Sequence, residues 1–131
     1  AHRAGELERE FRAAAFMTEL RHGEPGDPIG AVLALSDRFG NRVDLLFGLL
    51  GLGASAFSRA IIVPFQGREL RIIGREDFIA MKLFAHGPQD LLDAEHALAA
   101  ASQSLDLRLL RELTAGYGTK ATTALEHLLA R

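Results

Sequence analysis

A change of pattern near residue 75 constrains the fold of this chain more than any other feature of its sequence. Before that point, short apolar runs of strand length stand between glycine-containing turns. After it, apolar residues recur at helical spacing as far as the end of the sequence. Strands first and helices last predict an α/β protein of the α+β type, with a short mixed or antiparallel sheet followed by a C-terminal helical bundle.

Turn and breaker residues divide the chain into expected elements. An amphipathic helix over residues 5–20 runs into a short strand at residues 16–21, and residues 22–30 form a loop rich in proline and glycine. Two hairpins follow, one turning at Gly40 and Asn41 and one around Gly67, with a short helix between them. Four helices then fill residues 75–131, with Pro88 in the first turn of the second and with glycines at helix ends, namely Gly87, Gly116 and Gly118.

Composition narrows the class of protein without naming a partner. With 131 residues, 48% of them hydrophobic, the chain is expected to form a single domain, strand-rich over residues 1–74 and helical over residues 75–131. A formal net charge of −2 gives no preference for nucleic acid or for anionic membranes. The absence of cysteine excludes disulfides, thiolate metal sites and cysteine nucleophiles, and it favours a cytoplasmic location. No apolar run approaches the roughly 20 residues that cross a bilayer, so no membrane partner is expected.

One acidic residue interrupts an apolar strand. In "NRVDLLFGL", side chains alternate, so Asp44 shares a face with Arg42 and Leu46, opposite Val43 and Leu45. Asp44 is then either an exposed carboxylate paired with Arg42 or a neighbouring cation, or one ligand of a metal site that needs further oxygen ligands. The strand alone does not decide between these interpretations.

The helical half contains further candidate residues. Lys82 falls among apolar residues, so it is expected either to form a structural ion pair with Asp90 or Asp93, or to contact a nucleotide or phosphate. Glu76 and Asp77 are expected to cap the N-terminus of their helix. The histidines lack zinc spacing, the glycines near residue 50 lack the Lys-Ser/Thr ending of a phosphate loop, and no serine lies in a G-x-S-x-G elbow.

The segment "REDFIAMKLFAHGPQDLLDA", downstream of "RVDLL", resembles the C-terminal portion of a nucleotidyltransferase-like family. This family consists of bacterial minimal and abortive-infection toxin-like members of the DNA polymerase beta type superfamily. The resemblance covers about residues 6–129. It implies a sheet of nucleotidyltransferase type, with Asp44 as the third catalytic and metal-binding carboxylate, and it makes Arg42 and Lys82 candidates for nucleotide contact.

The family's Gly-Ser…Asp-x-Asp signature, which would precede the matched region, is absent from this sequence. One aspartate cannot hold the two cations, about 4 Å apart, of such phosphoryl transfer. We therefore expect that the first αβ unit of the fold is missing, and the start at Ala1 rather than at methionine favours truncation.

Two functions remain open from the sequence. In one, the intact protein transfers a nucleoside monophosphate from an NTP to a hydroxyl on protein, RNA or a small molecule, with Mg²⁺. In the other, the chain is a catalytically inactive binding or interaction module, for example a component of a toxin–antitoxin pair. A sheet without its first αβ unit would expose an edge, which predicts a homodimer, strand exchange or poor solubility.

Overall fold

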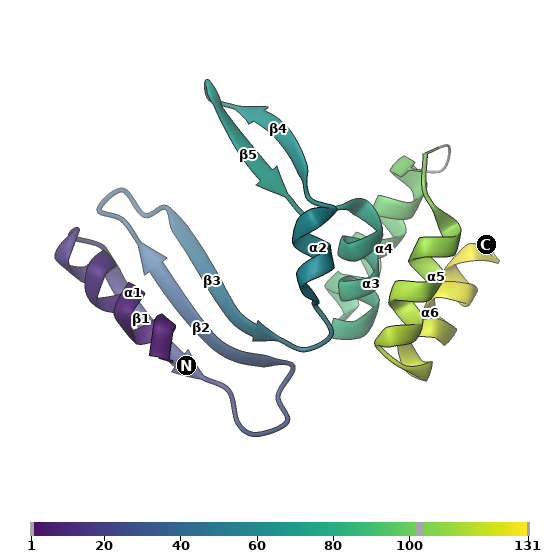
Figure 1. Cartoon of the computed structure of the whole chain (residues 1–131), viewed down its shortest axis with the longest axis horizontal. Coiled ribbons are helices and arrows are strands. Elements are labelled where there is room, and N and C mark those ends of the chain that lie inside the picture. The colour runs from purple at the N-terminus through teal and green to yellow at the C-terminus, as the bar shows by residue number, and fades with distance from the viewer. Residues whose placement is uncertain (1, 102–103, 131) are drawn as a thin grey trace. The chain divides into compact units, whose positions relative to one another are not determined.

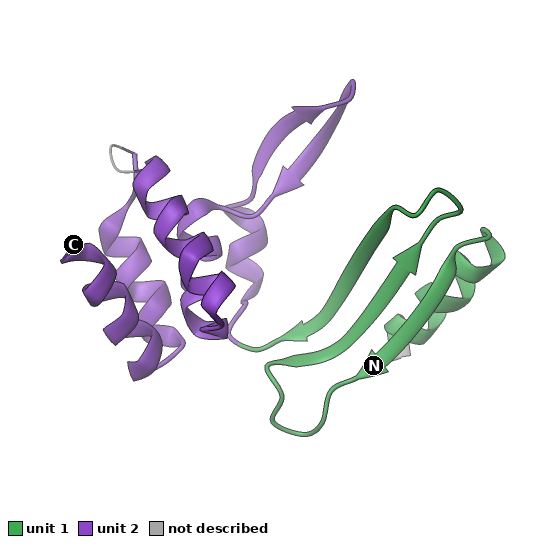
Figure 2. Ribbon diagram, turned by 180° about the vertical axis from the view of Figure 1, so that it is seen from behind, with its two compact units in different colours: residues 1–50 green, residues 51–131 purple. Residues whose placement is uncertain are grey.

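The computed structural model describes residues 2–101 and 104–130 of the chain (Figure 1). Internal contacts divide the chain into two compact units, residues 1–50 and residues 51–131 (Figure 2). Antiparallel strands occupy the first part of the chain and helices its C-terminal part, so the α+β prediction is confirmed. The strands form a three-stranded and a two-stranded sheet. The unit boundary precedes the pattern change at residue 75, so the second hairpin belongs to the helical unit.

The first unit is a helix packed on a three-stranded antiparallel sheet. Its elements are α1 (His2–Ala13), β1 (Met17–His22), β2 (Ile29–Ser36) and β3 (Arg42–Leu49), with β2 in the centre of the sheet. Helix α1 contacts β1 and β2, and the alternating β2 residues Ala31, Leu33 and Leu35 are buried. Strand β3 lies at the edge of the sheet, and α1 packs mainly on β1 and β2. Val43 of β3 is therefore 56% exposed.

The turn between β2 and β3 is held by a single carboxylate. Asp37 Oδ1 accepts hydrogen bonds from the backbone N of Phe39 at 2.8 Å and of Asn41 at 2.9 Å, and Asp37 Oδ2 accepts one from Asn41 Nδ2 at 2.8 Å. The Asn41 side-chain bond is the main cause that lowers the pKa of Asp37 below its ordinary value. Gly40 adopts a positive φ of 84°, so the turn lies where the sequence predicts it.

The second unit is built around helix α3. Its elements are α2 (Ala54–Ser58), β4 (Ile61–Phe65), β5 (Arg68–Ile72), α3 (Arg75–Ala85), α4 (Pro88–Ala101), α5 (Leu107–Gly116) and α6 (Thr119–Leu129). Helix α3 contacts α4, α5 and α6, and its Ile79, Ala80 and Leu83 are fully buried. They pack with Ala94, Leu110, Ala121 and Leu125 in one core. None of the described helices is both long enough and apolar enough to cross a membrane.

One local expectation about α3 was wrong. The N-cap residue is Gly74, and no side chain caps this helix, so Glu76 and Asp77 do not act as caps. Each carboxylate instead has a partner distant in sequence: Glu76 Oε1 accepts from Asp106 N at 3.0 Å, and Asp77 pairs with Arg59. At the other end, α3 stops just before Gly87, as expected, and the left-handed residue there is His86, with φ 59°.

Candidate functional site

Asp44 lies on the face of the first sheet that α1 does not cover. Helix α1 holds the opposite face, where Thr18 Oγ1 donates to Glu8 Oε1 at 3.3 Å, and the register pairs Thr18 with Leu35 but Asp44 with Ala34. The Asp44 side chain is 41% exposed. Its position on an edge strand and an open face makes the carboxylate accessible to a ligand.

Arg42 neutralises Asp44 from two residues away on the same face. Arg42 Nε donates to Asp44 Oδ1 at 3.1 Å, and Arg42 Nη2 donates to Asp44 Oδ2 at 3.4 Å. Both side chains are in contact with solvent, with 58% of Arg42 and 41% of Asp44 exposed, and such a surface pair contributes between zero and about 1 kcal/mol. The structure thus brings together these two predicted site residues, in a contact weak enough for a ligand to replace.

A second carboxylate, Glu19, lies on the same open face. The register places Glu19 and Asp44 on either side of Ala34, two strand spacings or about 10 Å apart. Glu19 has its own arginine two residues along the strand, with Arg21 Nε 3.5 Å from Glu19 Oε1. Among the described residues, no three His, Cys, Asp or Glu side chains are placed to hold a metal ion, so these two carboxylates do not form a metal centre.

Lys82 lies in the second unit, held between two aspartates of α4. Its Nζ is 2.9 Å from Asp90 Oδ1 and 2.8 Å from Asp93 Oδ2, and all three side chains are about 70% buried, with 27%, 28% and 30% exposed. The hydrogen bond to Asp90, followed by the one to Asp93, raises the pKa of Lys82 above its ordinary value. The bond from Lys82, followed by one from Gln89, lowers the pKa of Asp93.

Asp90 also links the two helices through the backbone. Its Oδ2 accepts from Gly87 N at 3.3 Å, the residue just before α4, which resembles the carboxylate half of a capping box. Lys82 also lies 5.6 Å from the centre of the Phe78 ring. With two carboxylates and a ring around it, the ammonium is compensated without any ligand. This arrangement favours the structural ion pair over a nucleotide contact.

The ion pair between Arg59 and Asp77 was missed by the sequence reasoning. Asp77 is only 4% exposed, and Arg59 approaches it with two nitrogens, Nη2 at 2.6 Å and Nε at 2.8 Å. One signal was available: Asp77 precedes Ala80 by three residues, on the buried face of α3. A carboxylate on a buried helix face requires a cation, although the sequence does not show which one.

A groove of about 620 Å³ runs between α4 and α6 in the second unit. Its walls include Leu91, Leu92 and Leu128, while Glu95 and Lys120 supply charge. His86 and His127 also line it, but in the described part of the chain they belong to no metal-ligand group. The groove contains none of the predicted site residues.

A scan of protein-family models found no match to this chain, and neither did a search of curated proteins.

Proposed function

We propose that this chain is part of a nucleotidyltransferase, which transfers a nucleoside monophosphate from an NTP to a hydroxyl acceptor, and that Asp44 is one carboxylate of its site. The observation that supports this proposal is the position of Asp44: an accessible carboxylate on the open face of edge strand β3, with an arginine beside it. A carboxylate in that position can orient the acceptor hydroxyl or remove its proton.

Arg42 is the residue proposed to contact the nucleotide. Its side chain is 58% exposed, and its guanidinium is bound only to Asp44 among the described residues, so it can turn toward a phosphate. Arginine binds phosphate oxygens with two parallel N–H donors, and that bond is stronger than an exposed ion pair. Lys82, by contrast, is proposed to be structural because Asp90 and Asp93 already surround its ammonium.

The described residues do not by themselves fit a pair of Mg²⁺ ions. Asp44 has one carboxylate neighbour on its face, about two strand spacings away, and two-metal transfer needs several carboxylates around both ions. The remaining ligands would have to come from another segment or another copy of the chain. In the alternative proposal the chain is an inactive binding module, and the same lack of clustered carboxylates favours it.

Isothermal titration with ATP, CTP, GTP and UTP, in Mg²⁺ or Mn²⁺, tests the proposal. We expect metal-dependent binding that is lost in Asp44→Asn. Glu19→Gln is a matched control, because Glu19 is an exposed strand carboxylate on the same face and also has an arginine two residues away. We expect this control to bind like the unsubstituted chain.

The pattern of losses distinguishes the two functions. Equal losses in Asp44→Asn and Glu19→Gln would mean that binding depends only on the charge of the face, and would contradict the assigned role. If no NTP binds with metal, this chain alone is not a working nucleotide site, and the proposed activity would depend entirely on ligands from another segment.

A further inference from the structure

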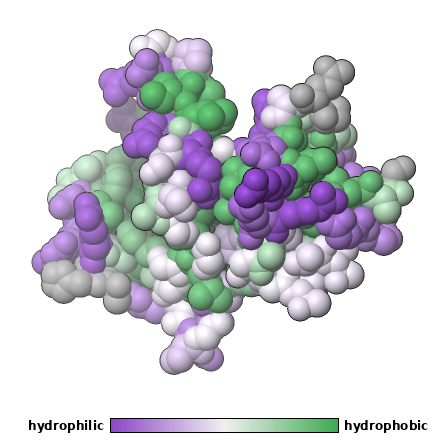
Figure 3. Space-filling view, turned by 45° about the vertical axis from the view of Figure 1, so that its right-hand side comes forward, coloured by the Kyte–Doolittle hydropathy of each residue, from purple (hydrophilic) through white to green (hydrophobic). Residues whose placement is uncertain are grey.

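The β4–β5 hairpin projects from the helices of the second unit with both strands exposed (Figure 1). Its cross-strand pairs place five apolar residues on one face, namely Ile61, Val63, Phe65, Leu70 and Ile72. Four of these are more than 40% exposed, and Figure 3 shows the hydrophobic side chains gathered on this projection at the upper left. A two-stranded hairpin is marginally stable alone, so an additional strand would stabilise it.

The two outer edges of the hairpin differ in their capacity to bind another strand. Gln66 and Gly67 form a two-residue turn with positive φ angles of 49° and 75°. Residues that flank such a turn exchange backbone hydrogen bonds, and the exchange recurs at every second pair. The pairs Pro64–Glu69 and Ile62–Arg71 therefore direct their backbone groups outward.

Pro64 blocks the outer edge of β4. It occupies one of the outward positions of β4, and proline has no N–H to donate to an added strand. On β5 the outward positions are held by Glu69 and Arg71, both of which offer a free N–H and C=O in an antiparallel ladder. The unblocked edge of the hairpin is thus β5.

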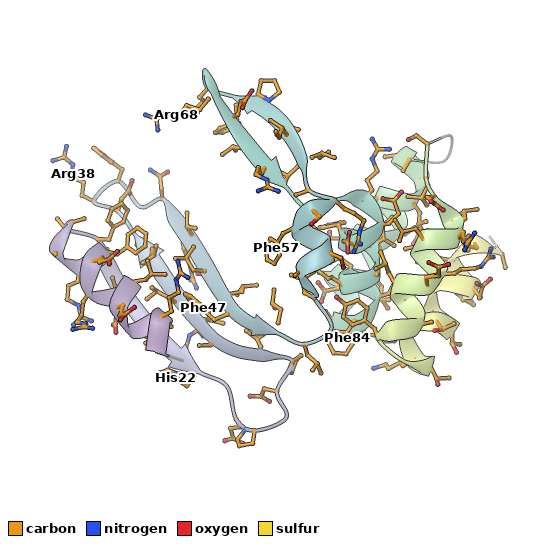
Figure 4. The ribbon with its side chains drawn as sticks, in the orientation of Figure 1. His22, Arg38, Phe47, Phe57, Arg68 and Phe84 are labelled. Atoms are coloured by element: carbon orange, nitrogen blue, oxygen red, sulfur yellow. The ribbon has the colours of Figure 1, made fainter. Side chains whose placement is uncertain are left out.

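Two side chains of opposite charge flank Leu70, the central residue of β5. In "RELRI", Glu69 and Arg71 lie on either side of Leu70 and share the face opposite the apolar one. Glu69 forms no ion pair with any described residue. Arg71 donates one hydrogen bond, from Nη2 to the carbonyl of Phe57 at 2.6 Å, and its other donors remain available. Figure 4 places Phe57 on α2 and Arg68 near the tip of the hairpin.

We propose that β5 pairs antiparallel with β5 of a second copy of this chain, around a two-fold axis at Leu70. In this register Glu69 of each copy lies directly opposite Arg71 of the other, and both positions have outward backbone groups. The two ladders join into a four-stranded sheet in which the Leu70 side chains meet at the axis.

Alternative registers of the same pairing are disfavoured by charge. An axis at Glu69 would place the two Glu69 side chains opposite each other, and an axis at Arg71 would do the same with two arginines. Like charges directly opposite destabilise a strand pair. The sequence of β5 is therefore complementary to itself in one register, which identifies a second copy as the partner. This inference does not depend on the proposed nucleotidyltransferase activity.

Sedimentation equilibrium of the full 131-residue chain and four variants tests the pairing. We expect the unsubstituted chain to form dimers. Glu69→Arg and Arg71→Glu each place like charges opposite at two sites, and each should raise the dimer Kd roughly tenfold or more. Arg68→Glu is the matched control: it changes charge as Arg71→Glu does, but residue 68 lies on the other face, opposite Ile72 in the proposed register, so dimerisation should persist.

Mixing provides the decisive measurement. An equimolar mixture of Glu69→Arg and Arg71→Glu chains places Arg opposite Glu at both sites, so heterodimers should form where neither variant dimerises alone. The double variant Glu69→Arg/Arg71→Glu should likewise dimerise, which separates the pairing from loss of the Phe57 contact. A monomeric unsubstituted chain, a dimer that no variant weakens, or a mixture that stays monomeric would overturn the proposal.

Discussion

Arg59 and Asp77, eighteen residues apart in sequence, form a two-pronged ion pair that joins the start of α3 to the end of α2. Asp77 is buried, whereas the Arg59 side chain keeps 29% of its surface in solvent. The pair raises the pKa of Arg59, chiefly through the hydrogen bond to Asp77. Because the Asp77 carboxylate is deeply buried, its charge must be compensated, and Arg59 provides that compensation.

Asp77→Asn tests that dependence. Removing the charge leaves two guanidinium donors facing a neutral amide, so we expect the free energy of unfolding to fall by about 1–3 kcal/mol. Urea unfolding at neutral pH measures it. Glu112→Gln is the control, since Glu112 forms an exposed helix pair with Arg108 at 3.0 Å and should lose less than about 0.5 kcal/mol. Equal losses in the two variants would contradict a special role for the buried pair.

Lys82→Met is expected to change how stability depends on pH. The folded-state pKa of Asp93 lies below its ordinary value, so its contribution is complete above the unfolded pKa and is lost as pH falls through the folded value. Urea unfolding between pH of about 5 and 2 should therefore show a weaker acid dependence in the variant than in the unsubstituted chain.

At alkaline pH, the contribution of Lys82 to stability decreases as pH rises, whereas that of Asp93 decreases as pH falls. The pKa of Lys82 is raised, so its contribution is complete below the ordinary lysine value and is lost as pH rises through the folded one. Lys120→Met is the control, because Lys120 is exposed on α6 and forms no ion pair with the described residues. If the stability of Lys82→Met and of Lys120→Met depends on pH in the same way, then Lys82 does not shift the pKa values of the α4 aspartates.

Gly51→Ala should destabilise the second unit. Gly51 has a φ of 78°, and a Cβ at this position would overlap the ring of Tyr117. Strain and overlap together are expected to lower the free energy of unfolding by about 1–3 kcal/mol, measured by thermal unfolding. Gly116→Ala should be neutral or stabilising, because a Cβ there meets nothing within 4 Å and the residue belongs to α5. An unchanged Tm for Gly51→Ala would show that the ring moves aside without cost.

Tyr117 should lose its proton at a higher pH than an ordinary tyrosine. Its ring stacks on Phe84 with 4.8 Å between centres, and burial raises its pKa above the ordinary value of 10.0. Since it is the single tyrosine of the chain, tyrosinate absorbance reports on this group alone. The unfolded chain loses the proton first, so stability should decrease as pH rises above the ordinary value. Phe84→Ala should bring the titration closer to normal, and an ordinary curve in the unsubstituted chain would contradict the burial argument.

Elements set by local patterns could be predicted from the sequence. The alternation around Asp44 correctly separates its face from that of Leu45, and a connection of two residues after α3 explains why Lys82 reaches Asp90 and Asp93. These relationships depend on neighbours within about ten residues, where helical and strand periodicity determine geometry.

Relationships between distant segments could not be predicted in the same way. Asp77 looked like a capping residue because its position in the first turn satisfies the local rule, yet the fold brings Arg59 to it. The outward direction of the Glu69 and Arg71 backbone groups also could not be predicted locally. It follows from the turn at Gln66 and Gly67 and from the strand register, which together decide which residues bond to β4 and which face outward. Local preference does not determine which distant partner a buried charge receives.

Pro64 limits how many copies of this chain can add to the β4–β5 hairpin. Strand addition at both edges of a hairpin leads to open-ended filaments, because each added copy offers a new edge to the next. With β4 blocked, growth is possible on one side only, and the addition of a single strand pair ends it. Through this hairpin the chain can therefore form pairs but not filaments.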